Sequence, residues 1–429
     1  MTDQEYAKLG SAFMRYLLPY RQHMGEIRAA FHLENYCRGL LSDAPRKTVE
    51  PLALRSGTTV RALQVFLKDG EWDHLEVGHD LQRRLANAFA DEPDPDGFGT
   101  IGLIDETSCV KQGDQTPGVR RQYLGCVGKI ENGIVTVHLG AVRSRLQALF
   151  DADLFLPKVW SEDRERCQKA GIPDPKQHEP KWKLALGQYT RACQNGFVFD
   201  WLVFDAGYGN TPTFLRTLNQ MNQRFVGEIP LHFWASRHQG GPKQKVREML
   251  LSNTRRGGKR LRIDHGSGDI SVWSYRSMVV FAAGRRQRLI VAIKSRTNEV
   301  KYFLSNAVST AVKTVLRVGL RRAPVEHLFR LAKQEVGLMH FEGRSYQGLM
   351  RHLILALVTL GFVSLHTAKL QKKRGADDGA GVPRVECVEW GMVTPPTRHL
   401  GEGVHPGSHS LPPGTQCHRE TIQAKTESV

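Results

Sequence analysis

The chain has 429 residues, of which 24% are charged and 40% hydrophobic, a composition typical of a folded protein and not of a largely disordered one. Its 60 lysines and arginines exceed its 43 acidic residues, which gives a net charge of +17. Such a surplus favours a polyanionic partner, with nucleic acid as the first candidate and an anionic membrane as the second. A basic surface that serves only solubility is the remaining alternative.

The charge surplus lies in the part of the chain that is expected to fold. Residues 371–429 carry seven basic and seven acidic side chains and are rich in Gly, Pro, Ser and His. They show little apolar periodicity, so we expect a disordered tail there. The whole surplus therefore belongs to residues 1–370.

Cysteines and apolar segments indicate a cytoplasmic protein. The seven cysteines are scattered and form no Cys-x-x-Cys pair, which argues against a disulfide framework or a zinc ribbon. The first ten residues, MTDQEYAKLG, are polar and unlike a signal peptide. The most apolar run, residues 353–363, has roughly half of the ~20 residues that a membrane span requires. We therefore expect a core helix there and no membrane association.

Residues 1–94 are predicted to form a helical N-terminal domain. Within it, residues 49–73 show two short helices separated at Ser56 and Gly57, with Thr58 as the expected N-cap of the second helix. This outline is typical of a DNA-binding helix-turn-helix, although a plain helical hairpin has the same pattern. A stretch rich in Pro, Gly and Asp then marks the end of this domain.

Strand patterns begin after this boundary. We expect residues 95–230 to form an α/β unit, with a hairpin at 120–142 whose turn is the Glu-Asn-Gly sequence at 131–133. The polar stretch at 151–196 predicts helices and loops. Further along the chain, residues 231–305 are β-rich, and residues 306–370 are helical.

Two predicted central strands are each followed by an aspartate. Asp105 stands where the apolar run of TIGLIDETSCV stops, and Asp205 follows the run WLVF, residues 201–204, just before a Gly-x-Gly turn. If these strands are neighbours, both carboxylates lie at one edge of the sheet, where they repel each other unless a cation sits between them. Mg²⁺ prefers such oxygen ligands. Two unrelated loop aspartates are the alternative.

A third carboxylate lies on a late helix. Pro324 suits the first turn of this helix and Gly337 its end. Glu326 and Lys333 are separated by two turns, so they lie on one side of the helix together with Arg330. This pattern fits a functional face that carries a metal ligand and a phosphate contact. It fits a solvated charged face equally well. The opposite side is a predicted buried stripe formed by Val325, Leu328, Phe329, Ala332 and Val336.

The order of the three carboxylates resembles the DDE transposases of bacterial insertion sequences. These enzymes carry two aspartates on strands and a glutamate on a late helix, and the matching positions here are Asp105, Asp205 and Glu326. The β-rich segment before the glutamate resembles one branch of that superfamily. Several sequence blocks, spread over about residues 30–370, also resemble one insertion-sequence family in the same order.

That branch has a signature of Tyr, Arg, Glu and Lys, abbreviated YREK. Arg322, Glu326 and Lys333 stand at the matching separations, whereas Gly319 replaces the tyrosine. The resemblance implies that the three carboxylates hold two Mg²⁺ ions, or Mn²⁺ in their place, for phosphodiester cleavage and strand transfer. It also implies that Arg322 and Lys333 neutralise phosphate charge.

The resemblance implies an α/β fold with an RNase H-like mixed sheet flanked by helices. A β-rich insertion at 231–305 would interrupt the core, which is then divided into 95–230 and 306–370. The helical domain at 1–94 would bind DNA.

Double-stranded DNA is the implied partner, both as the inverted repeats at the transposon ends and as the target. A homodimer on DNA is expected because two ends must be brought together, and a cytoplasmic, nucleoid-associated location follows. Either Trp234 or Trp273 is a candidate for stacking on a flipped base. Further phosphate contacts are expected from Arg121, Lys129, Arg255, Arg256, Lys259, Arg260 and Arg330.

Two other functions remain open from the sequence. The missing tyrosine and the long tail are compatible with a catalytically inactive, transposase-derived DNA-binding protein. The second alternative is a helix-turn-helix regulator, in which the resemblance of the core to the DDE transposases is accidental. The regulator predicts that residues 95–370 are dispensable for DNA binding, whereas the transposase predicts that Asp105, Asp205 and Glu326 converge.

Overall fold

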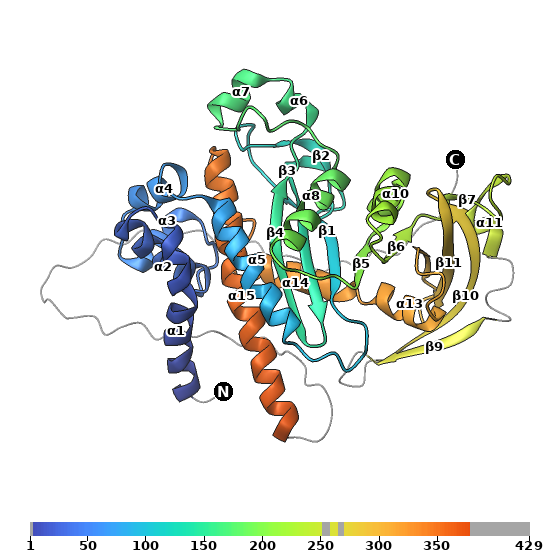
Figure 1. Ribbon diagram of the computed structural model, residues 1–429. Helices are drawn as coiled ribbons and strands as arrows, with labels where there is room; N and C mark the ends of the chain where they lie inside the picture. The colour runs from blue at the N-terminus through green and yellow to red at the C-terminus, as the bar shows by residue number, and fades with distance from the viewer. Residues whose placement is uncertain (1–2, 251–257, 265–269, 378–429) are drawn as a thin grey trace, which may run out of the picture. The chain divides into compact units, whose positions relative to one another are not determined.

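The computed structural model describes residues 3–250, 258–264 and 270–377 (Figure 1). The N-terminal part is helical, as predicted. Its second short helix is capped by Thr59, one residue after the predicted Thr58, because the Thr59 hydroxyl accepts a hydrogen bond from the Ala62 amide at 3.1 Å. The elements are α1 (Asp3–Leu17), the 3₁₀ helix η1 (Leu18–His23), α2 (Ile27–Leu40), α3 (Val49–Ser56), α4 (Val60–Lys68) and α5 (His74–Ala90).

The next part of the chain builds a mixed sheet. Its strands run in the order β4-β3-β1-β5-β6, in which β3 is antiparallel to both β4 and β1, and β5 is parallel to both β1 and β6. The fold class predicted from the sequence, a mixed sheet flanked by helices, is confirmed. The strands are β1 (Ile101–Val110), β2 (Arg120–Leu124), β3 (Lys129–Arg143), β4 (Leu146–Leu154), β5 (Trp201–Phe204) and β6 (Phe225–Ile229).

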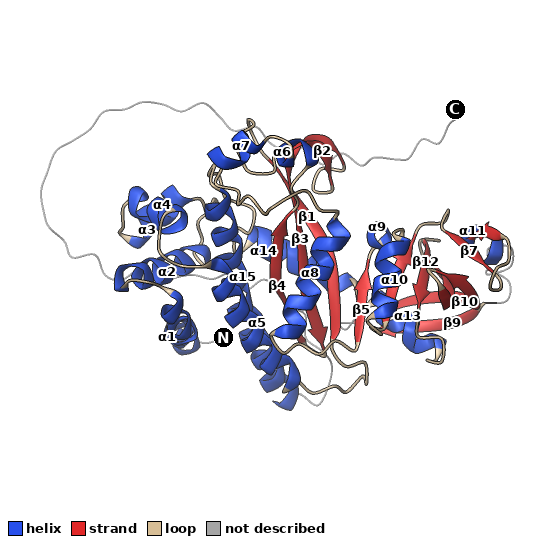
Figure 2. Cartoon of the chain, turned by 45° about the horizontal axis from the view of Figure 1, so that its top comes forward, coloured by secondary structure: helices blue, strands red, loops and turns tan. Residues whose placement is uncertain are grey.

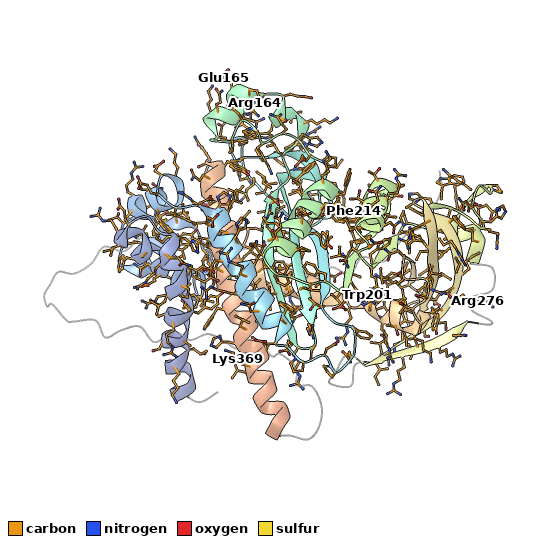
Figure 3. All side chains as sticks on the ribbon, in the orientation of Figure 1. Arg164, Glu165, Trp201, Phe214, Arg276 and Lys369 are labelled. Carbon is orange, nitrogen blue, oxygen red and sulfur yellow. The ribbon has the colours of Figure 1, made fainter. Side chains whose placement is uncertain are left out.

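Helices cover both faces of this sheet. Figure 2 shows α8 in front of β3 and β4, with α14 behind them. Trp201 on β5 and Phe214 on α10 are almost fully buried within the packed side chains (Figure 3). The connecting helices are α6 (Lys158–Ser161), α7 (Arg164–Lys169), α8 (Lys181–Gln194), α9 (Ala206–Gly209) and α10 (Pro212–Gln220).

The β-rich segment continues the same sheet. β12 pairs antiparallel with β6, so the insertion is hydrogen-bonded directly to the core and the sheet reaches 12 strands in the described part of the chain. The elements are β7 (Trp234–Ser236), β8 (Lys243–Lys245), α11 (Val246–Leu250), β9 (Lys259–Asp264), β10 (Ile270–Ala282), β11 (Arg285–Lys294) and β12 (Val300–Ser305).

Three helices close the described chain. α15 is long and apolar enough to cross a membrane by length and composition, but 67% of its most apolar window is buried against the protein, in agreement with the predicted core helix. α15 also continues past residue 371, and the remainder of the predicted disordered tail lies outside the described residues. The helices are α13 (Val312–Leu320), α14 (Ala323–Gln334) and α15 (Tyr346–Asp377).

Three local predictions were wrong. β1 does not end at Asp105 but continues to Val110, because β3 pairs with it along its whole length. The hairpin turn lies at 125–128, and the Asn132-Gly133 pair is inside β3. Gly133 is needed there because a Cβ atom would lie 2.2 Å from the Cys109 carbonyl oxygen. β4 occupies the start of the segment predicted as helices and loops.

Candidate active site

The backbone register places Asp105 beside Asp205. In the parallel pair β1–β5, Ile104 is opposite Phe204, and the two aspartates are the next residues on their strands. Neighbouring residues in register point to the same face of a sheet. The pairing therefore places both carboxylates on one face of the sheet where β5 ends, as predicted, although Asp105 lies inside β1 and not at its end.

Alternation along β1 separates Asp105 from its acidic neighbour. Glu106 points to the opposite face, where its carboxylate pairs with the Lys181 ammonium of α8 at 2.8 Å. His138 of β3 is paired with Asp105 and shares its face. The ring of Phe329 on α14 packs on His138 with centroids 5.2 Å apart, so α14 covers the face that carries Asp105.

Asp105 is almost fully buried in a polar surrounding. Its side chain receives a hydrogen bond from an Arg322 guanidinium nitrogen at 2.8 Å and another from the Glu106 amide at 2.8 Å. Burial raises the pKa of Asp105 to about 6; the negative charge of Asp205 adds to the rise, while Arg322 opposes it. The two aspartates are thus close enough to repel each other.

Asp205 begins the short helix α9. One of its carboxylate oxygens accepts hydrogen bonds from the amides of Gly207 at 3.0 Å and Tyr208 at 3.3 Å. Gly209 closes this turn against β6, because a Cβ atom there would lie 1.9 Å from the carbonyl oxygen of Glu228. The Gly-x-Gly sequence therefore lets the turn pack tightly on the sheet and holds the Asp205 side chain at its edge.

Arg322 supplies the positive charge between the aspartates. It is the residue before α14, and its pKa lies above the usual value because the carboxylates of Asp105, Asp205 and Glu228 outweigh its burial. The Arg322 guanidinium group therefore partly balances the negative charge of the two aspartates.

Glu326 does not join this group. Its side chain is exposed, although four residues of helix place it only about 6 Å along the axis from Arg322 and on the same side. Among the described residues, no three His, Cys, Asp or Glu side chains are close enough to share a metal ion. The structure thus brings together Asp105, Asp205 and Arg322 and leaves the predicted third carboxylate outside.

The buried stripe predicted for α14 is confirmed where its side chains are described: Leu328, Phe329, Ala332 and Val336 are buried. The Val325 side chain lies outside the described residues.

Lys333 lies over the same face of the sheet. Its charge helps burial to lower the pKa of His138, to about 3, and opposes the rise that burial causes in the pKa of Cys109. Lys333 is therefore close to the continuation of β1 beyond Asp105. It lies two turns beyond Glu326 along the helix.

The packing of α13 explains why a glycine stands at position 319. It lies inside α13, which packs on β6 and β12, and a Cβ atom would be 2.8 Å from a Val226 methyl group and 3.2 Å from the Phe303 ring. A side chain at this position would therefore require β6 or β12 to shift. The departure from the signature is therefore part of how α13 packs on the sheet.

The remaining predicted contacts are spread over the surface. Arg121 and Lys129 are exposed on the β2–β3 hairpin, and Lys129 pairs with Glu131 at 3.4 Å. Arg330 is exposed on α14 and contacts His327 at 2.8 Å. Lys259 and Arg260 are exposed on β9, whereas Arg255 and Arg256 lie outside the described residues.

The two candidate tryptophans differ. Trp273 is buried, and its ring nitrogen donates a hydrogen bond to Ser271 at 3.1 Å. Trp234 is 55% exposed on β7, with the Lys245 ammonium 5.6 Å from its ring centroid. Only Trp234 is therefore accessible for stacking.

Sequence reasoning missed two groups beside the aspartates. Glu228 follows Gly227, which is paired with Phe204, so it continues the row of Asp105 and Asp205 onto β6; it pairs with Lys301 of β12 at 3.1 Å. Tyr208 is buried, and the charges of both aspartates raise its pKa further beyond the effect of burial. The signal for Glu228 was a lone acid inside the apolar strand sequence FVGEI.

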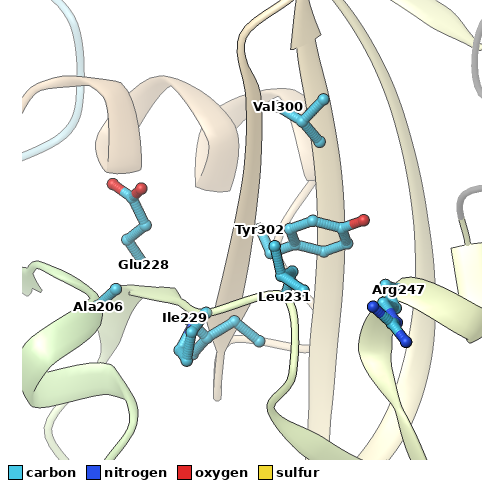
Figure 4. Close-up of a pocket in the computed structure, with 8 residues that line it drawn as sticks. Ala206, Glu228, Ile229, Leu231, Arg247, Val300 and Tyr302 are labelled. Carbon is cyan, nitrogen blue, oxygen red and sulfur yellow. The ribbon is translucent and has the colours of Figure 1, made fainter. Parts of the chain in front are cut away.

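A pocket of about 410 Å³ adjoins this row on the side of the insertion (Figure 4). It begins beside Asp205, since Ala206 is part of its wall. The residues that line it are Ala206, Glu228, Ile229, Pro230, Leu231, Arg247, Val300 and Tyr302.

Comparison with known families shows which family the chain belongs to. The family model described as DDE superfamily endonuclease matches residues 19–297. The chain belongs to the DDE superfamily endonucleases. The matched residues include both aspartates of the site and end before α14, which follows Arg322 and carries Glu326.

A curated relative of the chain is the "Probable transposase for insertion sequence element IS701" of Microchaete diplosiphon. It is 28% identical over 193 residues, which are 44% of this chain and 46% of the relative, so the chain spans about half the length of that protein. Among solved structures, the NurA nuclease from Sulfolobus solfataricus aligns over 70% of this chain and 93% of its own, with 11% identity and a TM-score of 0.23. That score is too low to support a conclusion.

Proposed function

We propose that this DDE superfamily endonuclease is a transposase that cleaves DNA at the ends of an insertion sequence and joins those ends to target DNA. The observation that carries the proposal is the pair of aspartates, Asp105 and Asp205, held side by side with Arg322 at the edge of the sheet. The transposase relative supports the choice among endonuclease activities.

The donor set suits a divalent metal. Asp105 and Asp205 offer hard oxygen ligands on one face, and the Arg322 guanidinium already provides the positive charge that this place requires. Mg²⁺ binds through one or two carboxylates together with phosphate oxygens, so the pair fits Mg²⁺, and Mn²⁺ as its substitute. When bound, two such ions supply an activated attacking oxygen and stabilise the leaving oxygen. Glu326 would complete the ligand set, because it lies one turn from Arg322.

The cationic side chains then act on the DNA. Arg322 would contact the scissile phosphate after leaving Asp105, and its planar guanidinium group suits the phosphate oxygens. Lys333, two turns further along the same side of α14, would hold a neighbouring phosphate. Both side chains would neutralise charge and orient the linkage, and no side-chain nucleophile is required.

Each segment of the chain would have its own role in this function. Residues 1–94 would bind the inverted repeats, 95–230 with 306–370 would form the catalytic core, and 231–305 would contact DNA beside it. The exposed basic residues of β9 and of the β2–β3 hairpin would contact phosphates of double-stranded DNA. Two copies of the chain would hold the two ends together.

A second function is favoured by two observations. Glu326 lies outside the aspartate pair and Gly319 replaces the signature tyrosine, which are the features expected of a catalytically inactive, transposase-derived DNA-binding protein. Such a protein would bind DNA through the same basic surfaces and would leave it uncut.

One assay separates the two functions. Supercoiled plasmid carrying the two terminal sequences of the element is incubated with the full chain and Mg²⁺ or Mn²⁺, and nicked and linear products are measured. The transposase predicts metal-dependent nicking at the ends by the natural chain and none by Asp105→Asn or Asp205→Asn, which still bind the DNA. Equal binding without nicking by any of these proteins would establish the inactive form.

A further inference from the structure

α3 and α4 form two short helices joined by a tight turn. The turn has three residues, Gly57 to Thr59, and Gly57 adopts a left-handed conformation with φ +65°. α2 packs on both helices. Two helices joined by three or four residues that include a glycine, and supported by a third helix, are typical of a DNA-binding helix-turn-helix.

The two sides of α4 differ sharply. Leu63, Phe66 and Leu67 are buried against the neighbouring helices. Arg61, Gln64 and Lys68 are exposed and lie three and four residues apart, so they form one stripe along the helix. The stripe contains two cations, one amide and no acid. Within the described part of the chain, the Arg61 and Gln64 side chains have no hydrogen-bond or ion-pair partner.

Arg351 of α15 anchors the last turn of α4. Arg351 is 1% exposed, and its guanidinium group donates hydrogen bonds to the carbonyl oxygens of Leu67 at 3.1 Å and Gly70 at 2.6 Å, as well as to that of Trp72. Its guanidinium carbon also lies 4.5 Å from the centre of the Trp72 ring. The anchor holds the carboxyl end of α4, where the Lys68 ammonium lies 3.9 Å from the Asp69 carboxylate. In the earlier turns, Arg61 and Gln64 remain exposed and available to a partner.

We propose that α4 is the recognition helix of this chain and that its stripe, Arg61, Gln64 and Lys68, reads the major groove of the DNA ends that the enzyme cleaves. The inference rests on the proposed function for the identity of that DNA. In this docking mode, the first residues of the second helix contact base edges. Arg61 is suited to the two acceptors of guanine and Gln64 to adenine, whereas Lys68, near the end of the helix, is suited to a phosphate.

The experiment measures sequence preference in EDTA, where no cleavage occurs. Full-length protein selects from a pool of duplexes with about 20 randomised base pairs, and the affinities for the selected duplex and for an unselected duplex are compared. Arg61→Ala and Gln64→Ala should each weaken binding to the selected duplex by about 10- to 100-fold and remove the preference at one or two positions, with little change on the unselected duplex. Lys68→Ala should weaken binding to both duplexes equally.

Controls keep the outcome unambiguous. Arg83→Ala removes an exposed arginine of α5, outside the helix-turn-helix, and should leave the selected sequence unchanged. Arg61→Lys keeps the charge, so it should retain the affinity for unselected DNA and lose only part of the preference. Failure of the natural chain to enrich any sequence, or enrichment of the same sequence by Arg61→Ala and Gln64→Ala, would overturn the inference. Since binding is scored without metal, this result is independent of whether the nicking assay succeeds.

Discussion

The sheet edge and α14 hold their acidic residues in different ways. Asp105 and Asp205 are positioned by main-chain hydrogen bonds, because the parallel register of β1 and β5 leaves them side by side. Glu326 is positioned only by the packing of α14 on the sheet and by the contact of Arg322 with Asp105. The two aspartates are therefore fixed by the sheet itself, whereas Glu326 could join them only if the first turn of α14 shifted.

The largest expected effect is the loss of DNA nicking when a carboxylate is removed either from the sheet or from α14. Asp105→Asn and Glu326→Gln should both reduce metal-dependent nicking by more than about a thousandfold, since each would remove a proposed metal ligand that contributes several kcal/mol at the transition state. Without DNA they should differ. Asp105→Asn should lose Mn²⁺ binding measured by electron paramagnetic resonance, and Glu326→Gln should retain it. Equal losses would mean that all three carboxylates converge before DNA binds.

A second test concerns the helix that leads into α14. Gly319→Ala inserts a methyl group against Val226 and should lower the free energy of unfolding by about 1–2 kcal/mol, because the strain exceeds the gain in helix propensity. Gly187→Ala is the matched control, since Gly187 also lies inside a helix and has no atom within 4 Å of the added methyl group. It should stabilise the protein by up to about 1 kcal/mol. Urea unfolding measures both, and a neutral Gly319→Ala would show that α13 is loosely attached.

A smaller effect tests Arg322 as the counter-charge of the aspartates. Arg322→Gln should increase the affinity for Mn²⁺ in the absence of DNA by about tenfold, because a bound ion no longer competes with a guanidinium group 2.8 Å from Asp105. Arg330→Gln removes an exposed arginine of the same helix and should leave the affinity unchanged. Calorimetric titration provides the measurement. Unchanged or weaker binding by Arg322→Gln would mean that the arginine acts on phosphate alone.

The smallest expected effect is a pH dependence of stability. The pKa of Asp105 is raised from 3.8 to about 6, so the folded protein binds this proton more readily than the unfolded chain. The group therefore adds stability as the pH falls through about 6, and the full contribution is present below the usual aspartate pKa. When the pH is lowered from about 7.5 to about 5, the free energy of unfolding of the metal-free natural chain should rise by roughly 1 kcal/mol relative to that of Asp105→Asn. If the difference in the free energy of unfolding between the two proteins stays constant over this range, Asp105 is well solvated.

Much of the site could be predicted because its strands carry strong local signals. The run from Trp201 to Phe204 is apolar and β-branched or aromatic, and the acid after it is out of place in a core. β4 could not be predicted in the same way. Its acids Asp151 and Asp153 resemble those of a loop, but both are bound by Arg191 at 2.8 Å, a partner about 40 residues away in the sequence. The role of Arg322 between the aspartates depends on the same kind of distant contact and was likewise invisible.

The buried arginine of α15 has a consequence for how the enzyme would measure DNA. Arg351 ties the end of α4 to the same helix that lines β4, and the neighbouring His352 bonds Tyr36 of α2 at 2.8 Å and the Gly337 carbonyl just beyond α14 at 3.0 Å. With α4 in the major groove, these contacts would fix the distance between the recognised sequence and the cleavage site. About five extra base pairs between the two are half a turn of DNA, so they would place the scissile bond on the far side of the double helix.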